Sequence, residues 1–401
     1  MAKRKIQKPT RFERMYKVWD YLRKNTDRRH PTSIAKMRKD ENINAYIGDK
    51  ETINRLLKDM ANIMNLKDGG SDYKPEAEWR LYFDDFKKFY GDKERYERDD
   101  SDEDDSYIAN VMRIKNLYYN RTFSEKEVDS IIEGIMATRT LDSKSAQELV
   151  RKVEDNMTTA FYKRTPRHIC KVQEPELADR ELLKDNLAII QKAIDDNVRI
   201  QFRFNGYSYE KKLEPVREES DELSPYYIVA SGGKYYLLAA KEYEDYKPDM
   251  SIWRIDLMTD IEIPGRNDRL HIKGIPRIPK KNVSNLPEKW SEDFQLKHLN
   301  MSFDKPVPVT LRIKSEKCEG NPKKRVRPGY TFLHDWFGDS FTYIRTETKP
   351  PYDDIVRVEC SPYGMAHWAL QYSELVEVLE PESLREDIKS KIKALNEKYS
   401  L

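Results

Sequence analysis

The chain has 401 residues, of which 38% are hydrophobic and 36% are charged. This length predicts two to four domains, and 73 Lys and Arg against 71 Asp and Glu exclude a uniformly basic protein. Any contact with nucleic acid must come from local basic patches. No apolar run approaches the roughly 18 residues of a membrane span, and the basic start is not typical of a signal peptide. Cys170, Cys318 and Cys360 lie far apart, which disfavours disulfides or structural zinc and fits a reducing cytoplasm.

Residues 1–91 are predicted to form a basic head. The first 30 residues hold 11 Lys and Arg against 3 Asp and Glu. Apolar spacing predicts a helix from Phe12, a short second helix up to Met37, and a third that opens at Gly48. A glycine-rich turn at residues 67–71 and a strand at 79–83 follow, in the order of a winged helix-turn-helix. The run 99–105, with six acids in seven positions, is typical of a solvated linker and places a boundary near residue 100.

The third helix offers the best DNA-reading face. Its polar side carries Asn54, Arg55 and Lys58, opposite an apolar stripe that includes Ile53 and Met60. Arginine suits guanine and asparagine suits adenine in the major groove, and lysines such as Lys50 and Lys58 can neutralise phosphates. Taken alone, the same pattern also fits a solvated face of an amphipathic helix. The preceding short helix, the glycine-rich turn and the basic head favour the DNA interpretation.

The rest of the chain mixes helical and strand periods. Residues 92–182 are predicted to be a helical linker, with helices capped at Ser124 and Asp142. Residues 183–275 change to period two and contain a hairpin turn at Gly232-Gly233, which predicts a small β-barrel. Residues 276–401 combine both periods and end in a helix after Pro381. The fold class is therefore α+β and multidomain.

The barrel carries a candidate ligand surface. Outward aromatic side chains beside cations can stack on bases and bind phosphates. Alternation along the second hairpin strand places Tyr236 and Lys234 on one face, and Asp256 two residues after Arg254 is expected to orient that arginine. The expected ligand-binding residues are Arg217, Tyr226, Lys234, Tyr236, Arg254, Arg325 and Arg327. The tyrosines also fit ordinary cross-strand pairs, and the basic run around Arg325 also fits a solvated loop.

Motifs for catalysis are missing from the sequence. There is no P-loop, no GxGxxG and no HExxH, and the six histidines are scattered. An enzyme that acts on nucleic acid would need an acidic metal site, which the sequence does not suggest. We therefore expect a protein that is not an enzyme and has no metal or cofactor.

The chain resembles the WYL-domain transcriptional regulators of bacteria. Tyr235-Tyr236-Leu237 stands where the family has Trp-Tyr-Leu, and residues 253–256 are similar to its Arg-x-Asp strand. Residues 49–59, 120–153 and 376–384 are similar to its recognition helix, its helical linker and the end of its C-terminal extension. Leu257, where many members have a second arginine, and the acidic run at 99–105 depart from the pattern. The resemblance implies an Sm-like barrel, a homodimer and a ligand-responsive repressor or activator.

Two hypotheses follow for function. In the first, the chain binds a double-stranded operator, and its barrel senses a nucleotide or single-stranded nucleic acid, which changes operator affinity. In the second, an accessory protein without a transcriptional role binds single-stranded RNA or DNA directly through the barrel. A gel shift on the DNA upstream of its own gene separates the two hypotheses.

Overall fold

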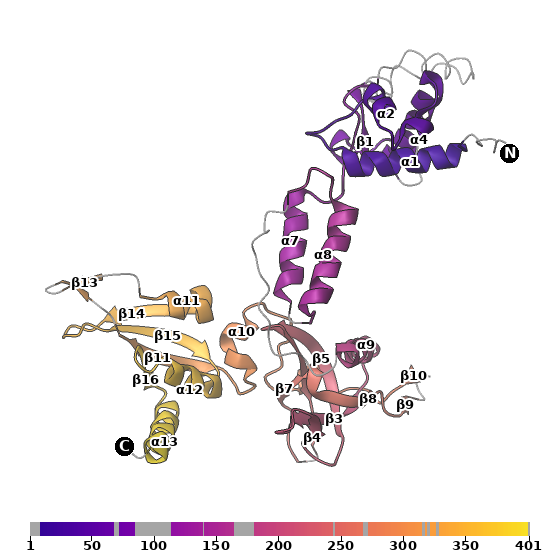
Figure 1. Cartoon of the computed structure of the whole chain (residues 1–401). Helices are drawn as coiled ribbons and strands as arrows, with labels where there is room; N and C mark the ends of the chain where they lie inside the picture. Colours follow the sequence, from indigo (N-terminus) through magenta and orange to yellow (C-terminus); the bar gives the residue numbers. More distant parts are fainter. Residues whose placement is uncertain are drawn as a thin grey trace. The chain divides into compact units, whose positions relative to one another are not determined.

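A computed structural model describes residues 9–67, 72–84, 114–138, 140–163, 180–243, 245–267, 272–314, 317–318, 321–325 and 329–399. The chain divides into two compact units, Met1–Pro175 and Glu176–Leu401, and each is described here by itself (Figure 1). Helices and sheets occur in both units, which confirms the α+β class.

The first unit begins with four helices that form a small head. They are α1 (Arg11–Asn25), α2 (Ile34–Lys39), α3 (Asn44–Ile47) and α4 (Lys50–Asn65). Thr10 and Glu13 cap α1 reciprocally, and the Asp49 carboxylate caps α4 by accepting a hydrogen bond from the Thr52 amide at 2.7 Å. The buried side chains of Val18 and Leu22 from α1 share one core with those from α4.

A two-stranded antiparallel sheet completes the head. After the 3-10 turn η1 (Glu76–Glu78), strand β1 (Leu81–Tyr82) pairs with β2 (Tyr118–Tyr119), so the partner strand lies beyond the acidic run. Leu117 also exchanges backbone hydrogen bonds with Thr32, at 2.8 and 3.0 Å, and is fully buried in the head core. The predicted boundary at residue 91 is therefore wrong, because the head takes its closing strand from the predicted linker.

Two antiparallel helices follow the head, as predicted. Helix α7 (Glu125–Ala137) begins with a capping box of Ser124 and Glu127, and Asp142 caps α8 (Ser143–Met157). Val128 and Ile132 pack against Val150 and Val153 between the two helices. The pair forms its own small core.

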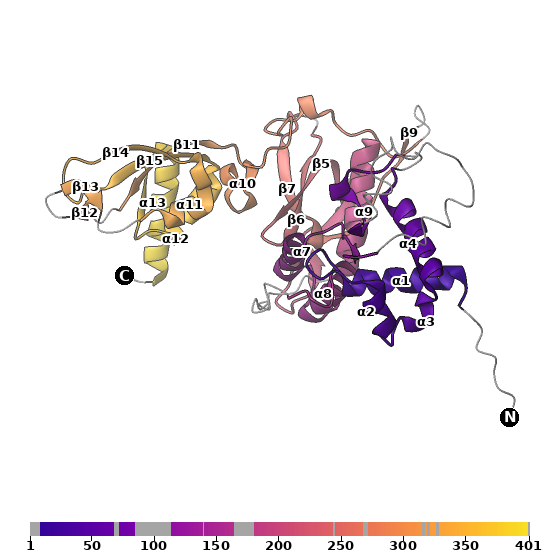
Figure 2. The same cartoon turned by 90° about the horizontal axis from the view of Figure 1, so that it is seen from above.

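The second unit opens with a curled sheet beside helix α9 (Arg180–Asp196). Its strands are β3 (Ile200–Tyr207), β4 (Leu213–Pro215), β5 (Asp221–Ser231), β6 (Lys234–Ala240), β7 (Met250–Arg254) and β8 (Met258–Glu262). The order is β4-β3-β5-β6-β7, and β8 also pairs with β3. A single 3-10 turn, η3 (Ile255–Leu257), joins β7 to β8, so the sheet curls back toward its first strand. Buried residues of α9 pack with those of β3 and β6 in one core (Figure 2).

The hairpin of β5 and β6 has the predicted two-residue turn. Ser231 pairs with Lys234, and both Gly232 and Gly233 have positive φ, at 55° and 73°. Such a turn matches the twist of antiparallel strands and favours glycine at both positions. It fixes the register, with Val229 opposite Tyr236 and Tyr236 opposite Arg254 on the next strand.

A connecting segment leads from the curled sheet to a second sheet. It contains β9 (Arg266–Asn267), β10 (Ile272–Lys273), η4 (Lys280–Asn282), α10 (Phe294–Lys297) and η5 (Leu299–Met301). Tyr227 and Trp290 belong to a row of aromatic rings that continues through Phe294 to His298. The segment is therefore packed onto the β5–β6–β7 strands and is not a free linker.

The last part is a four-stranded sheet with helices on one face (Figure 2). Its order is β14-β15-β11-β16, from β11 (Val307–Ile313), β14 (Thr342–Thr346), β15 (Asp354–Cys360) and β16 (Val376–Glu380). The helices are α11 (Thr331–Phe337), α12 (Pro362–Gln371) and α13 (Glu382–Tyr399). The smaller elements here are β12 (Lys317–Cys318), β13 (Asn321–Arg325) and η6 (Gly338–Ser340). Cys360 lies fully buried in this core, and burial raises the pKa of its thiol to about 12.

Helix α13 packs on the sheet only through its first half. Leu384 is buried and Ile388 is half-buried against the core. Ile392, Leu395 and Tyr399 follow on the same helix and are 51%, 43% and 68% exposed. None of the helices in the described part of the chain is both long and apolar enough to cross a membrane.

Candidate nucleic-acid interfaces

Helix α4 does not expose the predicted DNA-reading side chains. Asn54 is only 1% exposed and Lys58 only 8%. Arg55 and Lys50 do lie on the surface, and Arg55 forms an ion pair with Glu51 at 2.7 Å. The prediction that Asn54, Arg55 and Lys58 share a free polar face is therefore wrong for two of the three.

The reason is that α4 buries two sides. Besides the predicted stripe through Ile53 and Met60, a second row holds Asn54, Leu57, Lys58, Ala61 and Asn65. These residues follow each other at helical spacing and lie on one side. At the end of the row, Asn65 donates to the Leu81 carbonyl at 2.8 Å and accepts from the amides of Arg80 and Leu81. This side of α4 therefore holds strand β1.

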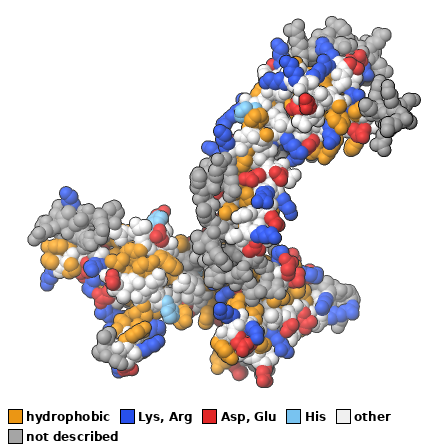
Figure 3. Space-filling view, in the orientation of Figure 1, with side chains coloured by type: hydrophobic (Ala, Val, Ile, Leu, Met, Phe, Trp, Pro, Cys, Tyr) orange, Lys and Arg blue, Asp and Glu red, His pale blue; other side chains and the backbone are white. Residues whose placement is uncertain are grey.

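A basic surface lies instead on α2 and next to the start of α4. Lys36, Arg38 and Lys39 are exposed on the short helix α2. Figure 3 shows Lys and Arg side chains gathered over this part of the head. Arg38 donates to the Gly48 carbonyl at 3.2 Å, so the basic end of α2 is held against the residue that precedes the α4 cap. The N-terminus of a helix favours anions.

The curled sheet brings together two of the predicted ligand residues. Tyr236 on β6 is the direct cross-strand partner of Arg254 on β7, and both are half-buried. The Arg254 guanidinium forms a two-pronged ion pair with the buried Asp256, at 3.1 and 2.5 Å. Burial alone would lower the pKa of Arg254, but the hydrogen bonds and charge of Asp256 raise it above its ordinary value. Asp256 therefore orients Arg254, as the sequence predicted.

Tyr226 does not lie on the face of the sheet that carries Tyr236 and Arg254. It is 2% exposed, its hydroxyl donates to the Ile278 carbonyl at 2.7 Å, and Arg277 stacks on its ring. Because Val229 faces Tyr236, strand alternation puts Tyr227, and not Tyr226, on the face of Tyr236. The placement of Tyr226 on the ligand surface is therefore wrong, and the turn register, which is readable from the sequence, identifies Tyr227.

The other predicted residues are dispersed. Lys234 opens β6, two residues from Tyr236 and thus on its face. Arg217 pairs with the buried Asp221 at 3.2 Å and stacks on Trp253, which packs into the sheet core on the opposite side of β7 from Arg254. Arg325 ends strand β13, where the structure describes its backbone only, and Arg327 lies outside the described residues.

One neighbour of Arg254 was missed in the sequence. Tyr207 at the end of β3 is 47% exposed, and its hydroxyl is close enough to influence the pKa of Arg254, as Tyr236 also does. Arg254 therefore lies within electrostatic range of a tyrosine from each of two strands. No periodic signal marks Tyr207, because its approach depends on how the sheet curls.

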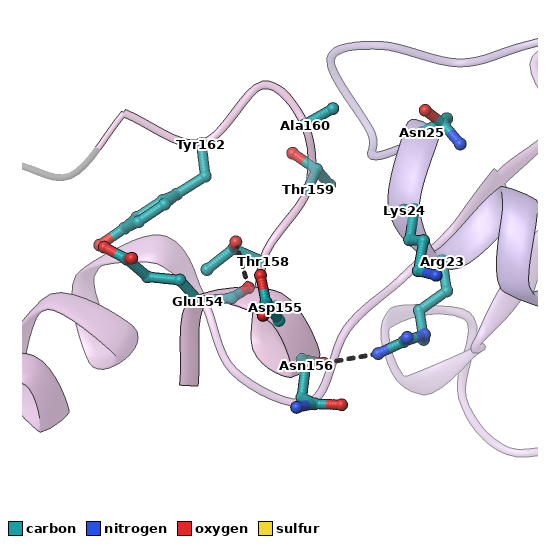
Figure 4. Close-up of a pocket in the computed structure, with 10 residues that line it drawn as sticks. All are labelled: Arg23, Lys24, Asn25, Glu154, Asp155, Asn156, Thr158, Thr159, Ala160 and Tyr162. Atoms are coloured by element: carbon teal, nitrogen blue, oxygen red, sulfur yellow. Dashed lines mark hydrogen bonds between the residues drawn. The ribbon is translucent and has the colours of Figure 1, made fainter. Parts of the chain in front are cut away.

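A polar cavity lies where the head meets the helix pair (Figure 4). It has a volume of about 930 Å³ and is lined by the ends of α1 and α8. Arg23 donates to the Asn156 carbonyl at 3.0 Å, and Arg121 joins the carbonyls of Thr26 and Thr158 at 3.2 and 3.0 Å. Two arginines thus bind the C-terminal carbonyls of α8, which otherwise lack helical partners.

Metal chemistry has no visible basis in the described part of the chain. No group of three or more His, Cys, Asp or Glu side chains there is placed to hold a metal ion. The predicted absence of enzymatic activity stays a prediction.

Comparisons with known proteins identify the last domain. Residues 305–395 match the family described as WCX domain. The search of curated proteins gave no match. Among solved structures, the proteasome accessory factor B/C (PafBC) of Arthrobacter aurescens is 16% identical, with a TM-score of 0.22, and covers 72% of this chain. A CRISPR Cas-related protein is 13% identical, with a TM-score of 0.31, over 74% of this chain and 77% of its own.

The chain spans 40% of the length of the PafBC structure. The WCX domain is the C-terminal domain associated with WYL domains, and it lies where the sequence resembled the C-terminal extension of that family. The match at residues 305–395 therefore supports the resemblance of this chain to the WYL family.

Proposed function

We propose that the protein is a DNA-binding transcriptional regulator whose curled sheet senses a nucleotide or single-stranded nucleic acid. The observation that carries this proposal is the WCX match at residues 305–395, which follows, after the connecting segment, a sheet that presents Arg254 beside Tyr236. On this proposal the sheet is the Sm-like barrel of a WYL domain. On the same proposal the head, with helices α1 to α4 and the β1–β2 pair, is a winged helix-turn-helix.

The DNA surface of the head is revised by the burial of Asn54 and Lys58. The residues that remain are Lys50 and Arg55 at the exposed start of α4 and the basic residues of α2. Their charges suit phosphates. Arg55 can bind the edge of a guanine if it gives up its ion pair with Glu51. Binding through such ionic interactions weakens steeply with salt.

The test is a mobility shift with the DNA upstream of the gene, at several salt concentrations. Lys36→Gln and Lys39→Gln together should weaken all DNA binding and reduce the salt slope by about 1 for each phosphate that is no longer neutralised. Arg55→Ala should lower specific affinity by about 1–3 kcal/mol if Arg55 reads a base. Lys126→Gln, an exposed lysine on α7, is the matched control. Unchanged binding in the α2 double variant would contradict this surface.

We propose a homodimer in which the exposed end of α13 meets a second copy. Ile392, Leu395 and Tyr399 form the unpacked continuation of the stripe that Leu384 begins. Two copies would bind a two-fold operator and neutralise more phosphates than one head can. Light scattering should give a molar mass of about twice the 47.7 kDa of one chain. Leu395→Glu should lower the measured mass to that of a single chain.

The same residues of the curled sheet would serve the alternative, an accessory protein that binds single strands without a transcriptional role. The register of Tyr236 and Arg254 favours neither hypothesis. A chain that binds single strands but shifts no upstream fragment would establish the alternative.

A further inference from the structure

The face of the sheet that carries Arg254 continues toward the connecting segment. Tyr236 lies opposite Val229, and one step along the strands Leu238 lies opposite Tyr227. Alternate residues share a face, so Tyr227 and Tyr236 point to the same side, about 7 Å apart along the strand direction. Both rings border the same buried cluster, which includes Leu238 and Phe294.

Tyr227 holds a lysine in place at the far end of this face. The Lys280 ammonium lies 4.1 Å from the centre of the Tyr227 ring and donates to its hydroxyl at 2.8 Å. The same hydroxyl donates to the carbonyls of Pro287 and Glu288, at 3.1 Å each. These bonds fix the loop that precedes Trp290 against the same ring that holds Lys280.

Trp290 offers a second aromatic surface next to the Tyr227 ring. Its ring packs 5.8 Å from Tyr227 on one side and 5.5 Å from Phe294 on another, yet 43% of the residue stays exposed. The exposed Lys289 precedes Trp290, but the acids Glu288, Glu292 and Asp293 lie within three residues of it, so the cation of this position is Lys280 on the Tyr227 ring. An indole held by its neighbours is suited to stack on a base, and a lysine on the adjoining Tyr227 ring can meet a phosphate.

We infer that Trp290 and Lys280 form a second stacking position, so the ligand is a single strand of at least two nucleotides and not a mononucleotide. This inference rests on the proposed function. One nucleotide binds at the position formed by Arg254 and Tyr236. A following nucleotide reaches Trp290, with its phosphate toward Lys280. The buried cluster between the two positions provides a rigid floor.

The experiment measures binding of the full-length protein to thymidine monophosphate and to a thymidine tetranucleotide, by competition against a fluorescent tetranucleotide. Wild type should bind the tetranucleotide at least about tenfold more tightly. Trp290→Ala should weaken tetranucleotide binding about tenfold and leave the mononucleotide unchanged, whereas Arg254→Ala should weaken both. Trp290→Phe should restore most of the affinity. Tyr343→Ala, a 52% exposed aromatic on β14, is the matched control.

Lys280→Gln is a second test of the inference, because it removes the charge and leaves the aromatic row in place. It should lower tetranucleotide affinity severalfold and flatten its salt dependence. Equal affinities of wild type for the two ligands, or an unchanged tetranucleotide affinity in both Trp290→Ala and Lys280→Gln, would overturn the inference while the proposed function stands. If wild type binds neither ligand, the sensing role fails and this inference fails with it.

Discussion

Helix α4 and the β6–β7 strand pair both carry polar side chains beside apolar ones, yet they divide them differently between core and surface. On β6 and β7, Leu237 and Trp253 face the core shared with α9, while Tyr236 and Arg254 lie on the opposite face of the sheet, where Tyr236 borders a second buried cluster. On α4, Asn54, Lys58 and Asn65 are buried together with the apolar stripe. Each side chain of a strand points to one of the two faces of the sheet, so neighbouring residues separate cleanly. A helix inside a small domain can bury more than half of its circumference, and a polar residue that borders its stripe, such as Asn65, can then hold a neighbouring strand.

The largest effect expected from this comparison is at Asn65. Asn65→Ala removes three hydrogen bonds to Arg80 and Leu81 and leaves buried backbone groups of β1 without partners. We expect the free energy of unfolding to fall by about 3 kcal/mol, measured by urea denaturation. Arg55→Ala, on the exposed side of the same helix, should change it by less than about 0.5 kcal/mol. Equal effects would show that the two sides of α4 do not differ.

A smaller effect is expected at Asp256. Asp256→Ala leaves Arg254 without its ion pair, but Arg254 keeps a side chain that is 29% exposed and can turn to water. We therefore expect the free energy of unfolding to fall by about 2 kcal/mol, below the usual cost of breaking a fully buried pair. Ligand affinity should fall with it, since the guanidinium is no longer oriented. Asp256→Asn keeps the size and one acceptor, and should retain most of the stability. A stable Asp256→Ala variant with full ligand affinity would contradict this role.

The smallest effect concerns the pH dependence set by His298. Burial lowers the pKa of this imidazole, while the Ser302 carbonyl, 2.7 Å from Nδ1, acts in the opposite direction. Because the unfolded chain then takes up the proton more readily, stability is unaffected well above the ordinary pKa of about 6.5 and falls as the pH drops below it. We expect the free energy of unfolding to fall by about 1 kcal/mol between roughly pH 7.5 and 5.5.

Urea unfolding at these two pH values measures this change. His298→Gln should show a shallower dependence on pH, because it removes the titrating group. The same slope in both proteins would assign the pH dependence to other groups.

The sequence predicts local structure well where the signal is local. The caps at Ser124 and Asp142 and the turn at Gly232-Gly233 depend on residues within a few positions, and the structure confirms them. The pairing of β1 with β2 joins two short strands on opposite sides of the acidic run and has no periodic signature. The hydrogen bonds of Asn65 to Arg80 and Leu81 depend on the same long-range packing. The error at Tyr226 was avoidable, because the turn sets the register.

Strand β2 also decides which piece of the chain can fold as the head. Thr26 at the end of α1 is fully buried and accepts the Tyr119 amide at 3.0 Å, and Leu117 fills the core beside Thr32. A fragment that ends at residue 91 would expose the apolar surface that Leu117 covers and leave β1 without a partner strand. A fragment that ends near residue 123 keeps both. A protease cut between Asp84 and Ile114 would leave the two pieces held together by β1 and β2, as in a protein reassembled from two chains.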